Sequence, residues 1–128
     1  MMEPLVRQLA TAYEKYQDPA TGLWYQVVDK GNLPGNWLET SSSCMYTYTL
    51  SRAIERGYIG KRYAKVSKKG KLSRDGDGFA HIADICEGTN VGDLNFYLAR
   101  PRTTDDFHGL GAFLIMNEQL RGFPLSAL

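Results

Sequence analysis

The sequence predicts a mostly α-helical protein with short β-hairpins in two long loops. Two observations lead to this fold class. Four segments carry apolar residues at spacings of three and four, the period at which an α-helix places side chains on one face. The connections between these segments are unequal, because the first and third are long whereas the second is only a few residues. A length of 128 residues suits one core, so residues 1–128 are expected to form a single domain.

The first helix is expected over residues 3–17. Its apolar positions recur at helical spacing, and Pro4 is tolerated because the first turn needs no N–H from it. Asp18 and Pro19 then end the helix. The long connection that follows contains one strand-like run, residues 24–28.

The second helix is expected to begin in the run Ser41–Ser43, because serine hydroxyls accept hydrogen bonds from the free N–H groups of a first turn. It ends at Gly57, a residue suited to the left-handed conformation that follows many helices. Only a few residues separate it from a third helix, which is expected over residues 61–69.

The second long connection extends from about residue 73 to residue 104. It holds a turn, Asp75–Gly78, and two expected strands, residues 79–85 and residues 95–98. His81 lies in the first of these strands and is expected to be partly buried.

The last helix is expected to start at Thr104 or Asp105 and to end at Gly122, with Pro124 just beyond it. If the helices pack antiparallel, both long connections lie at the same end of the molecule. That end also holds the N-termini of the second and fourth helices, whose unsatisfied N–H groups suit oxygen-rich or anionic ligands. The loop lengths therefore predict a binding site there.

Charge and composition restrict the partners. The 15 basic and 14 acidic residues give a net charge of +1, so nothing favours nucleic acid or an anionic membrane. The basic run 65–71 is interpreted as a solvated helix end. No apolar stretch reaches the roughly twenty residues that span a bilayer, and the N-terminus lacks a signal-peptide pattern. Cys44 and Cys86 form neither a disulfide framework nor a metal-ligand spacing, so a cytoplasmic location without a cofactor is expected.

A first group of candidate binding residues lies in the first long connection and the start of the second helix. Aromatic rings stack on the apolar faces of sugars, and nearby amide, carboxylate and hydroxyl groups can bind sugar hydroxyls. The same pattern also fits a loop held by buried tryptophans, with the carboxylate and the serines capping the helix. The group consists of Trp24, Gln26, Asp29, Trp37, Glu39, Ser41 and Ser43.

A second group opens the last helix. Asp105 and Asp106 precede His108, and a histidine beside two carboxylates can clamp a sugar by hydrogen bonds. Acidic residues in a first turn also complement the helix dipole without any ligand. Gly109 and Gly111 follow, and glycine early in an apolar helix allows another helix or a ligand to approach closely.

Five short segments then carry a resemblance in their order and spacing: Gly22–Asp29, Asn36–Met45, Arg56–Ile59, Cys86–Gly92 and Asp105–Gly109. Together they resemble the C-terminal part of the unsaturated glucuronyl and rhamnogalacturonyl hydrolases, glycoside hydrolase families 88 and 105. The resemblance extends from about residue 4 to residue 121. It implies a partial six-hairpin α/α barrel, with the second and fourth helices on the inside and a funnel at their N-terminal ends.

The resemblance also implies a reaction. These enzymes hydrate the C4–C5 double bond of a 4,5-unsaturated uronic acid at the non-reducing end of pectin-type or glycosaminoglycan-type oligosaccharides. An acid with a raised pKa protonates the vinyl ether, water adds, and the hemiketal opens. The family's catalytic aspartate and its Trp–Arg–Gly–Gly–Trp-type segment have no counterpart here. No catalytic residue is therefore assigned, and the chain is expected to be inactive alone. The expected substrate-binding residues are Trp24, Gln26, Trp37, Glu39, Ser41, Ser43, Asp106 and His108.

Two alternatives remain at this point. One is a non-catalytic carbohydrate-binding remnant, and the other is part of a different α/α-barrel sugar enzyme, such as an epimerase or another glycosidase. The expected partner is an oligosaccharide with an unsaturated uronic acid, rather than nucleic acid or a membrane. Because a partial barrel leaves apolar helix faces uncovered, self-association or an origin as a truncated reading frame is also expected.

Overall fold

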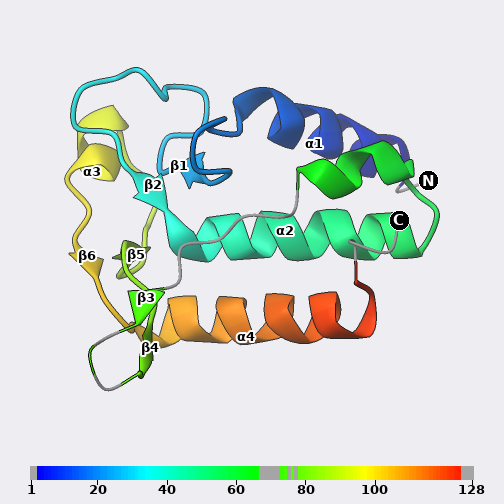
Figure 1. Ribbon diagram of the computed structural model, residues 1–128. Coiled ribbons are helices and arrows are strands. Elements are labelled where there is room, and N and C mark those ends of the chain that lie inside the picture. The colour runs from blue at the N-terminus through cyan, green and yellow to red at the C-terminus, as the bar shows by residue number, and fades with distance from the viewer. Residues whose placement is uncertain (1–2, 67–72, 75, 77, 125–128) are drawn as a thin grey trace.

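The computed structural model describes residues 3–66, 73–74, 76 and 78–124, and it is mostly helical, as the sequence predicts (Figure 1). Its short strands pair antiparallel as β1–β2, β3–β4 and β5–β6. The elements in chain order are α1 (Glu3–Tyr16), β1 (Trp24–Tyr25), β2 (Leu38–Glu39), α2 (Thr40–Glu55), the 3₁₀ helix η1 (Lys61–Lys65), β3 (Ser73–Arg74), β4 (Ala80–His81), β5 (Ile85–Cys86), α3 (Leu94–Leu98), β6 (Arg102–Thr103) and α4 (Phe107–Gly122).

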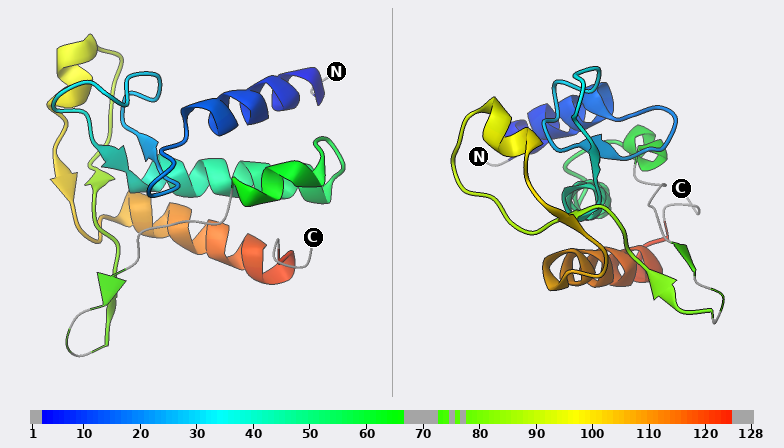
Figure 2. Two further views of the ribbon diagram at one scale, coloured as in Figure 1. Left: turned by 45° about the horizontal axis from the view of Figure 1, so that its top comes forward. Right: turned by 90° about the vertical axis from the view of Figure 1, so that its left-hand side faces the viewer.

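Helix α2 lies in the middle of the fold. Helix α1 and η1 cover one side of it, and α4 covers the other (Figures 1 and 2). Helices α2 and α4 run in the same direction, whereas α1 runs the opposite way (Figure 1). The N-termini of α2 and α4 therefore lie at one end, together with the long connections that lead into them. This confirms the arrangement that the loop lengths predict.

The core lies between α1, α2 and η1. Trp24 is fully buried there, and its ring meets the edge of Tyr46 at a centroid distance of 5.4 Å. Tyr46 in turn stacks on Tyr13 of α1 at 4.2 Å. Aromatic pairs in these geometries add to the free energy gained by burying their surface. The aromatic residues thus join the first long connection to the helices.

The ends of the helices agree closely with expectation. Asp18 ends α1 by accepting hydrogen bonds from the backbone N–H and the hydroxyl of Thr21. Gly57 follows α2 with a φ of +73°, the left-handed conformation for which glycine suits a helix C-terminus. Helix α4 begins slightly later than predicted, because Asp105 has a φ of +62° and cannot belong to a helix.

Three expectations need correction. The predicted strand at residues 95–98 is the short helix α3, because the Asp93 carboxylate accepts a hydrogen bond from Phe96 N at 2.8 Å and caps a helical turn. The predicted strand 79–85 is two strands, β4 and β5, separated at Asp84, whose φ is +55°. The third helix is the 3₁₀ helix η1, and the rest of its predicted length lies outside the described residues.

Other sequence expectations fall partly beyond the described part of the chain. The turn at residues 75–78 and the basic run at residues 65–71 are described only in part. Among the described helices, none has the length and apolar character required to cross a bilayer.

Candidate functional site

The start of α2 is capped by Glu39, not by a serine. The Glu39 side chain is 2% exposed, and its Oε1 accepts hydrogen bonds from Ser41 N at 3.0 Å and from Ser41 Oγ at 2.7 Å. Oε1 also accepts from Cys86 N at 3.0 Å, and Oε2 accepts from Ser42 N. A buried carboxylate requires such donors to offset its desolvation. Glu39 therefore holds the helix start and the strand β5 together, and it is sealed from solvent.

Ser43 and Trp24 complete this buried arrangement. The Ser43 hydroxyl donates to Glu39 O and accepts from Trp24 N at 3.0 Å. The Trp24 indole Nε1 donates to Tyr13 O at 2.8 Å. All three groups are inside the protein, so the interpretation as a loop held by a buried tryptophan fits Trp24, Glu39 and Ser43.

Gln26 directly follows β1 in the chain, and Trp37 directly precedes β2. Gln26 Nε2 is 3.5 Å from Cys86 Sγ, and Gln26 N donates to Trp37 O at 2.8 Å. Trp37 is 6% exposed, and the Arg102 guanidinium lies over its ring at 5.1 Å from the ring centroid. Arg102 also approaches Asp84 at 3.8 Å, and about half of its side chain remains exposed. At this position, Arg102 rather than the tryptophan face is presented to solvent.

The start of α4 is built from two separate histidine–carboxylate pairs. Asp106 caps the helix, and its Oδ1 lies 2.9 Å from both the backbone N and the ring Nδ1 of His108. Asp105 instead binds His81, whose Nδ1 is 2.6 Å from Oδ2, and accepts from Ile82 N at 2.9 Å. His81 is partly buried, as predicted, whereas the His108 side chain is 76% exposed.

The segment from Ile82 to Cys86 connects the two helix starts. Thr40 donates its N–H to Asp84 O at 2.9 Å and its hydroxyl to Ala83 O at 2.7 Å. On the other side, Ile85 packs so tightly against α4 that a Cβ added to Gly109 would lie 2.3 Å from it. The predicted close approach at Gly109 is thus made by β5. These contacts place both helix starts in one region, as Figure 1 shows.

The pKa values of the two partly exposed carboxyl groups at the start of α4 are shifted in the direction opposite to that required of a proton donor. The hydrogen bond from His81 lowers the pKa of Asp105, with the Ile82 N–H adding to the effect. The backbone N–H of His108, and then its ring, lower the pKa of Asp106. A general acid at neutral pH needs a raised pKa. Asp105 and Asp106 are therefore anionic hydrogen-bond acceptors.

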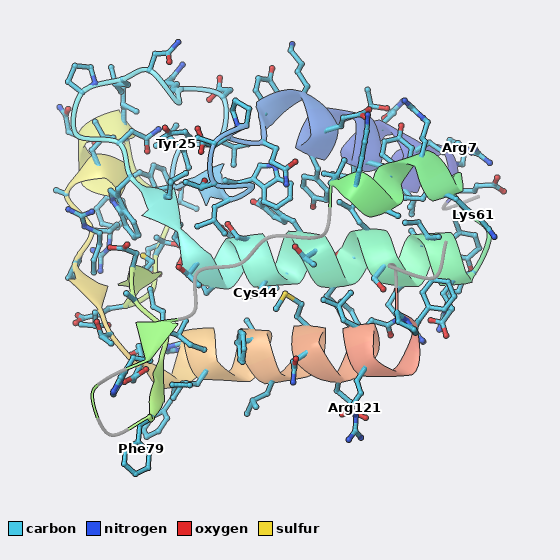
Figure 3. The ribbon with its side chains drawn as sticks, viewed as in Figure 1. Arg7, Tyr25, Cys44, Lys61, Phe79 and Arg121 are labelled. Atoms are coloured by element: carbon cyan, nitrogen blue, oxygen red, sulfur yellow. The ribbon has the colours of Figure 1, made fainter. Side chains whose placement is uncertain are left out.

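Cys44 is not a nucleophile either. Burial raises the pKa of its thiol to about 12, and the nearby Glu39 carboxylate adds to the effect. The side chain points from α2 toward α4 (Figure 3). A thiol this protonated is inert. Within the described ranges, no three His, Cys, Asp or Glu side chains come together to hold a metal ion.

The structure thus divides the predicted binding residues into two sets. Buried residues are Trp24, Trp37, Glu39 and Ser43, and the partly or largely accessible ones are Gln26, Ser41, Asp106 and His108. Sequence reasoning missed Arg102 and His81 in this region, and it grouped Asp105 with His108 although its partner in the structure is His81. Their contacts join segments far apart in the chain, and no local pattern signals them.

The sequence model of Glycosyl Hydrolase Family 88 matches residues 1–121 of this chain. The chain therefore belongs to this family of sugar-cleaving enzymes. Three similar solved structures are described as members or possible members of glycoside hydrolase family 105. The resemblance to the C-terminal part of families 88 and 105 is thereby confirmed.

The solved structures come from three bacteria. The C. acetobutylicum ATCC 824 protein is 28% identical, with a TM-score of 0.80, and the match covers 94% of this chain and 38% of that one. The Salmonella enterica protein is 28% identical with a TM-score of 0.73 over 94% and 32%. The Klebsiella pneumoniae protein is 29% identical with a TM-score of 0.70 over 89% and 30%.

Two curated relatives are also similar. Protein Atu3128 from Agrobacterium fabrum and a 24.9 kDa protein in the picA locus of Rhizobium radiobacter are each 30% identical to this chain. Each match covers 73% of this chain and 49% of the relative. The chain thus spans about half the length of these relatives.

Proposed function

We propose that this chain forms part of the sugar-binding wall of a glycoside hydrolase that hydrates 4,5-unsaturated uronic acids. The substrate would be the non-reducing end of a pectin-type or glycosaminoglycan-type oligosaccharide. The observation that carries the proposal is the accessible Asp106–His108 pair at the N-terminus of α4, at the same end of the molecule as the start of α2, in a chain of family 88. The helices would form a sector of a six-hairpin α/α barrel, which the parallel course of α2 and α4 supports (Figure 1).

The accessible side chains suit an acidic sugar. Asp106 orients His108 through Nδ1, which leaves Nε2 as the ring nitrogen for a sugar hydroxyl or carboxylate. The Arg102 guanidinium lies over the Trp37 ring, and its planar group of N–H donors matches the geometry of a carboxylate. In this proposal, Arg102 and His108 bind the uronate, and Gln26 and Ser41 line the same region. Trp24, Trp37, Glu39 and Ser43 support this wall from inside.

The chain alone is proposed to bind without turnover. Protonation of the vinyl ether needs a carboxyl group that keeps its proton near neutral pH and faces the sugar. Asp105 and Asp106 have lowered pKa values, and Glu39 is buried under four hydrogen bonds. These observations favour a binding role over a catalytic one for this part of the fold. A cytoplasmic location belongs to the proposal, because both cysteines are free and buried.

The test is a titration with an unsaturated galacturonyl disaccharide. Loss of the double-bond absorbance reports hydration, and a change in tryptophan fluorescence reports binding near Trp37. We expect a fluorescence change without absorbance loss, weakened by Arg102→Gln and by His108→Ala. Arg121→Gln is the matched control, because Arg121 projects from the far end of α4 (Figure 3).

Each other outcome has a defined meaning. Absorbance loss that disappears on replacing Asp106 with asparagine would show that the chain carries its own catalytic acid. Fluorescence that responds equally in the Arg102 and Arg121 variants would remove these residues from the sugar site. Binding of a neutral disaccharide as tight as that of the uronide would favour a different α/α-barrel sugar enzyme.

A further inference from the structure

A polar pocket lies where the end of α1 meets the first long connection (Figures 1 and 2). It has a volume of about 260 Å³, and its walls come from residues 15–19 and residues 25–32. Sites for drug-sized ligands measure roughly 300–1,000 Å³, so this pocket suits a smaller molecule such as one sugar ring. Because both walls belong to neighbouring segments of this chain, the pocket forms without the further helices of the longer relatives.

The loop wall of the pocket is fixed by its own hydrogen bonds. Asn36 Oδ1 accepts from Val27 N at 3.1 Å, and Asn36 Nδ2 donates to Val27 O at 2.9 Å and to Lys30 O at 2.8 Å. Leu33 N also donates to Lys30 O at 2.9 Å. A loop that is held in this way loses little further freedom on binding, which favours a ligand.

Two tyrosine rings line the pocket. The loop rests against the Tyr25 ring, since a Cβ added to Gly31 would lie 3.0 Å from Tyr25 Cε2. Tyr16 of α1 supplies the second ring, and Lys15 Nζ lies 4.7 Å from its centroid. Both tyrosines are partly exposed. Aromatic rings stack on the apolar faces of sugars, so these walls suit a sugar ring.

Polar groups in the same pocket are available to a ligand. Neither the Asn32 amide nor the Tyr25 hydroxyl has a hydrogen-bond partner among the described residues. In the same part of the chain, the Asp29 carboxylate has only Lys30 Nζ nearby, at 3.5 Å. An amide donates and accepts hydrogen bonds, and a carboxylate accepts them. Together these groups match neighbouring hydroxyls on one sugar.

The charges around the pocket indicate an uncharged sugar. Asp18 and Asp29 are balanced by Lys15 and Lys30, so no net charge attracts a uronate, and a carboxylate in the wall repels one. Among the described residues, no third His, Cys, Asp or Glu joins the two aspartates to hold a metal ion. We propose that this pocket is a second carbohydrate site, which binds one uncharged sugar unit.

The pocket is separate from the proposed uronate site. Gln26 N donates to Trp37 O and continues the β1–β2 pairing, so the side chains of Tyr25 and Gln26 point to opposite faces of the hairpin. Gln26 reaches Cys86, whereas Tyr25 contacts Gly31. The inference therefore does not depend on the proposed function.

An NMR titration of the whole chain tests the proposal. The probe is methyl β-galactoside, which carries several hydroxyls and one apolar face. Methyl β-galacturonoside is the charged comparison, because it differs only in the carboxylate at C6. We expect millimolar galactoside to shift the backbone amide signals of residues 28–32 and the side-chain amide signals of Asn32. The galacturonoside should bind more weakly.

Variants locate the binding. Asn32→Ala should weaken galactoside binding about fivefold, the equivalent of one hydrogen bond. Asn90→Ala is the matched control, because Asn90 is an exposed asparagine of the other long connection and does not line the pocket. Tyr25→Phe keeps the ring and should weaken binding less than Asn32→Ala. Arg102→Gln should leave galactoside binding unchanged, even if it abolishes binding of an unsaturated uronide. The amide spectrum of each variant verifies that it is folded.

Three results would overturn the proposal. The first is a wild-type chain whose signals from residues 28–32 do not move with galactoside. The second is equal weakening by Asn32→Ala and Asn90→Ala. The third is tighter binding of the galacturonoside than of the galactoside at these residues.

Discussion

The starts of α2 and α4 have the same kind of acidic cap but opposite surroundings. Each helix is preceded by an acidic cap, Glu39 in one case and Asp106 in the other. Glu39 is buried and accepts four hydrogen bonds, one of them from the distant strand β5. Among the described residues, the Asp106 side chain accepts hydrogen bonds only from the exposed His108 of its own helix. The cap that joins two segments is structural, and the cap that remains local is accessible to a ligand.

The largest expected effect is on the buried cap. Glu39→Ala leaves the N–H groups of Ser41, Ser42 and Cys86 without their acceptor inside the protein. We expect the free energy of unfolding to fall by about 3 kcal/mol, measured by urea unfolding. Glu39→Gln keeps one acceptor oxygen, so it should lower the free energy of unfolding by a smaller amount. If Asp106→Ala lowers the free energy of unfolding as much as Glu39→Ala does, the two caps do not differ in their structural role.

The next largest effect concerns how α4 is held. Gly109→Ala forces a methyl group into Ile85, and the overpacking should lower the free energy of unfolding by about 1–3 kcal/mol. Gly111→Ala is the matched control two residues away and should raise it by up to about 1 kcal/mol in the monomer. Both values come from urea unfolding at low concentration. Equal effects would mean that α4 does not rest on β5 through Gly109.

Asp105 should contribute to the acid sensitivity of the fold. Its pKa in the folded protein lies below the ordinary 3.8, because His81 and the Ile82 N–H favour the ionised form. The resulting stabilisation is therefore present above pH 3.8 and is lost as the pH falls through the lower folded-state pKa. The melting temperature of the wild type should drop more steeply in this range than that of Asp105→Asn. Parallel curves would mean that this pair does not stabilise the fold.

The smallest effect on stability is expected at the accessible cap. Asparagine caps a helix as well as aspartate does, so Asp106→Asn should leave the melting temperature nearly unchanged. It removes the negative charge beside His108, however, and should weaken binding of an unsaturated uronide. An Asp106→Asn variant with an unchanged melting temperature and a weaker affinity for the uronide would support the distinction between the two caps. A destabilised variant with unchanged affinity would assign Asp106 the same structural role as Glu39.

Much of this fold follows from the sequence because the relevant signals are local. The helical periods locate α1, α2 and α4, and Gly57 and Asp18 mark helix ends. The alternation of long and short connections places the starts of α2 and α4 together. The strand expected at residues 95–98 was wrong because its apolar run says nothing of the Asp93 cap, which favours a helical turn.

The sequence by itself determined the family, helices α1, α2 and α4 and the end of the molecule where the long connections meet, since periodicity and capping act between near neighbours. Only the tertiary structure decided which polar residues remain accessible. Burial of Glu39 under Cys86 N–H, the cover of Arg102 over Trp37 and the pairing of His81 with Asp105 all join distant segments. Whether a carboxylate caps a helix or faces a sugar depends on what packs against it, and that packing partner is not encoded nearby in the chain.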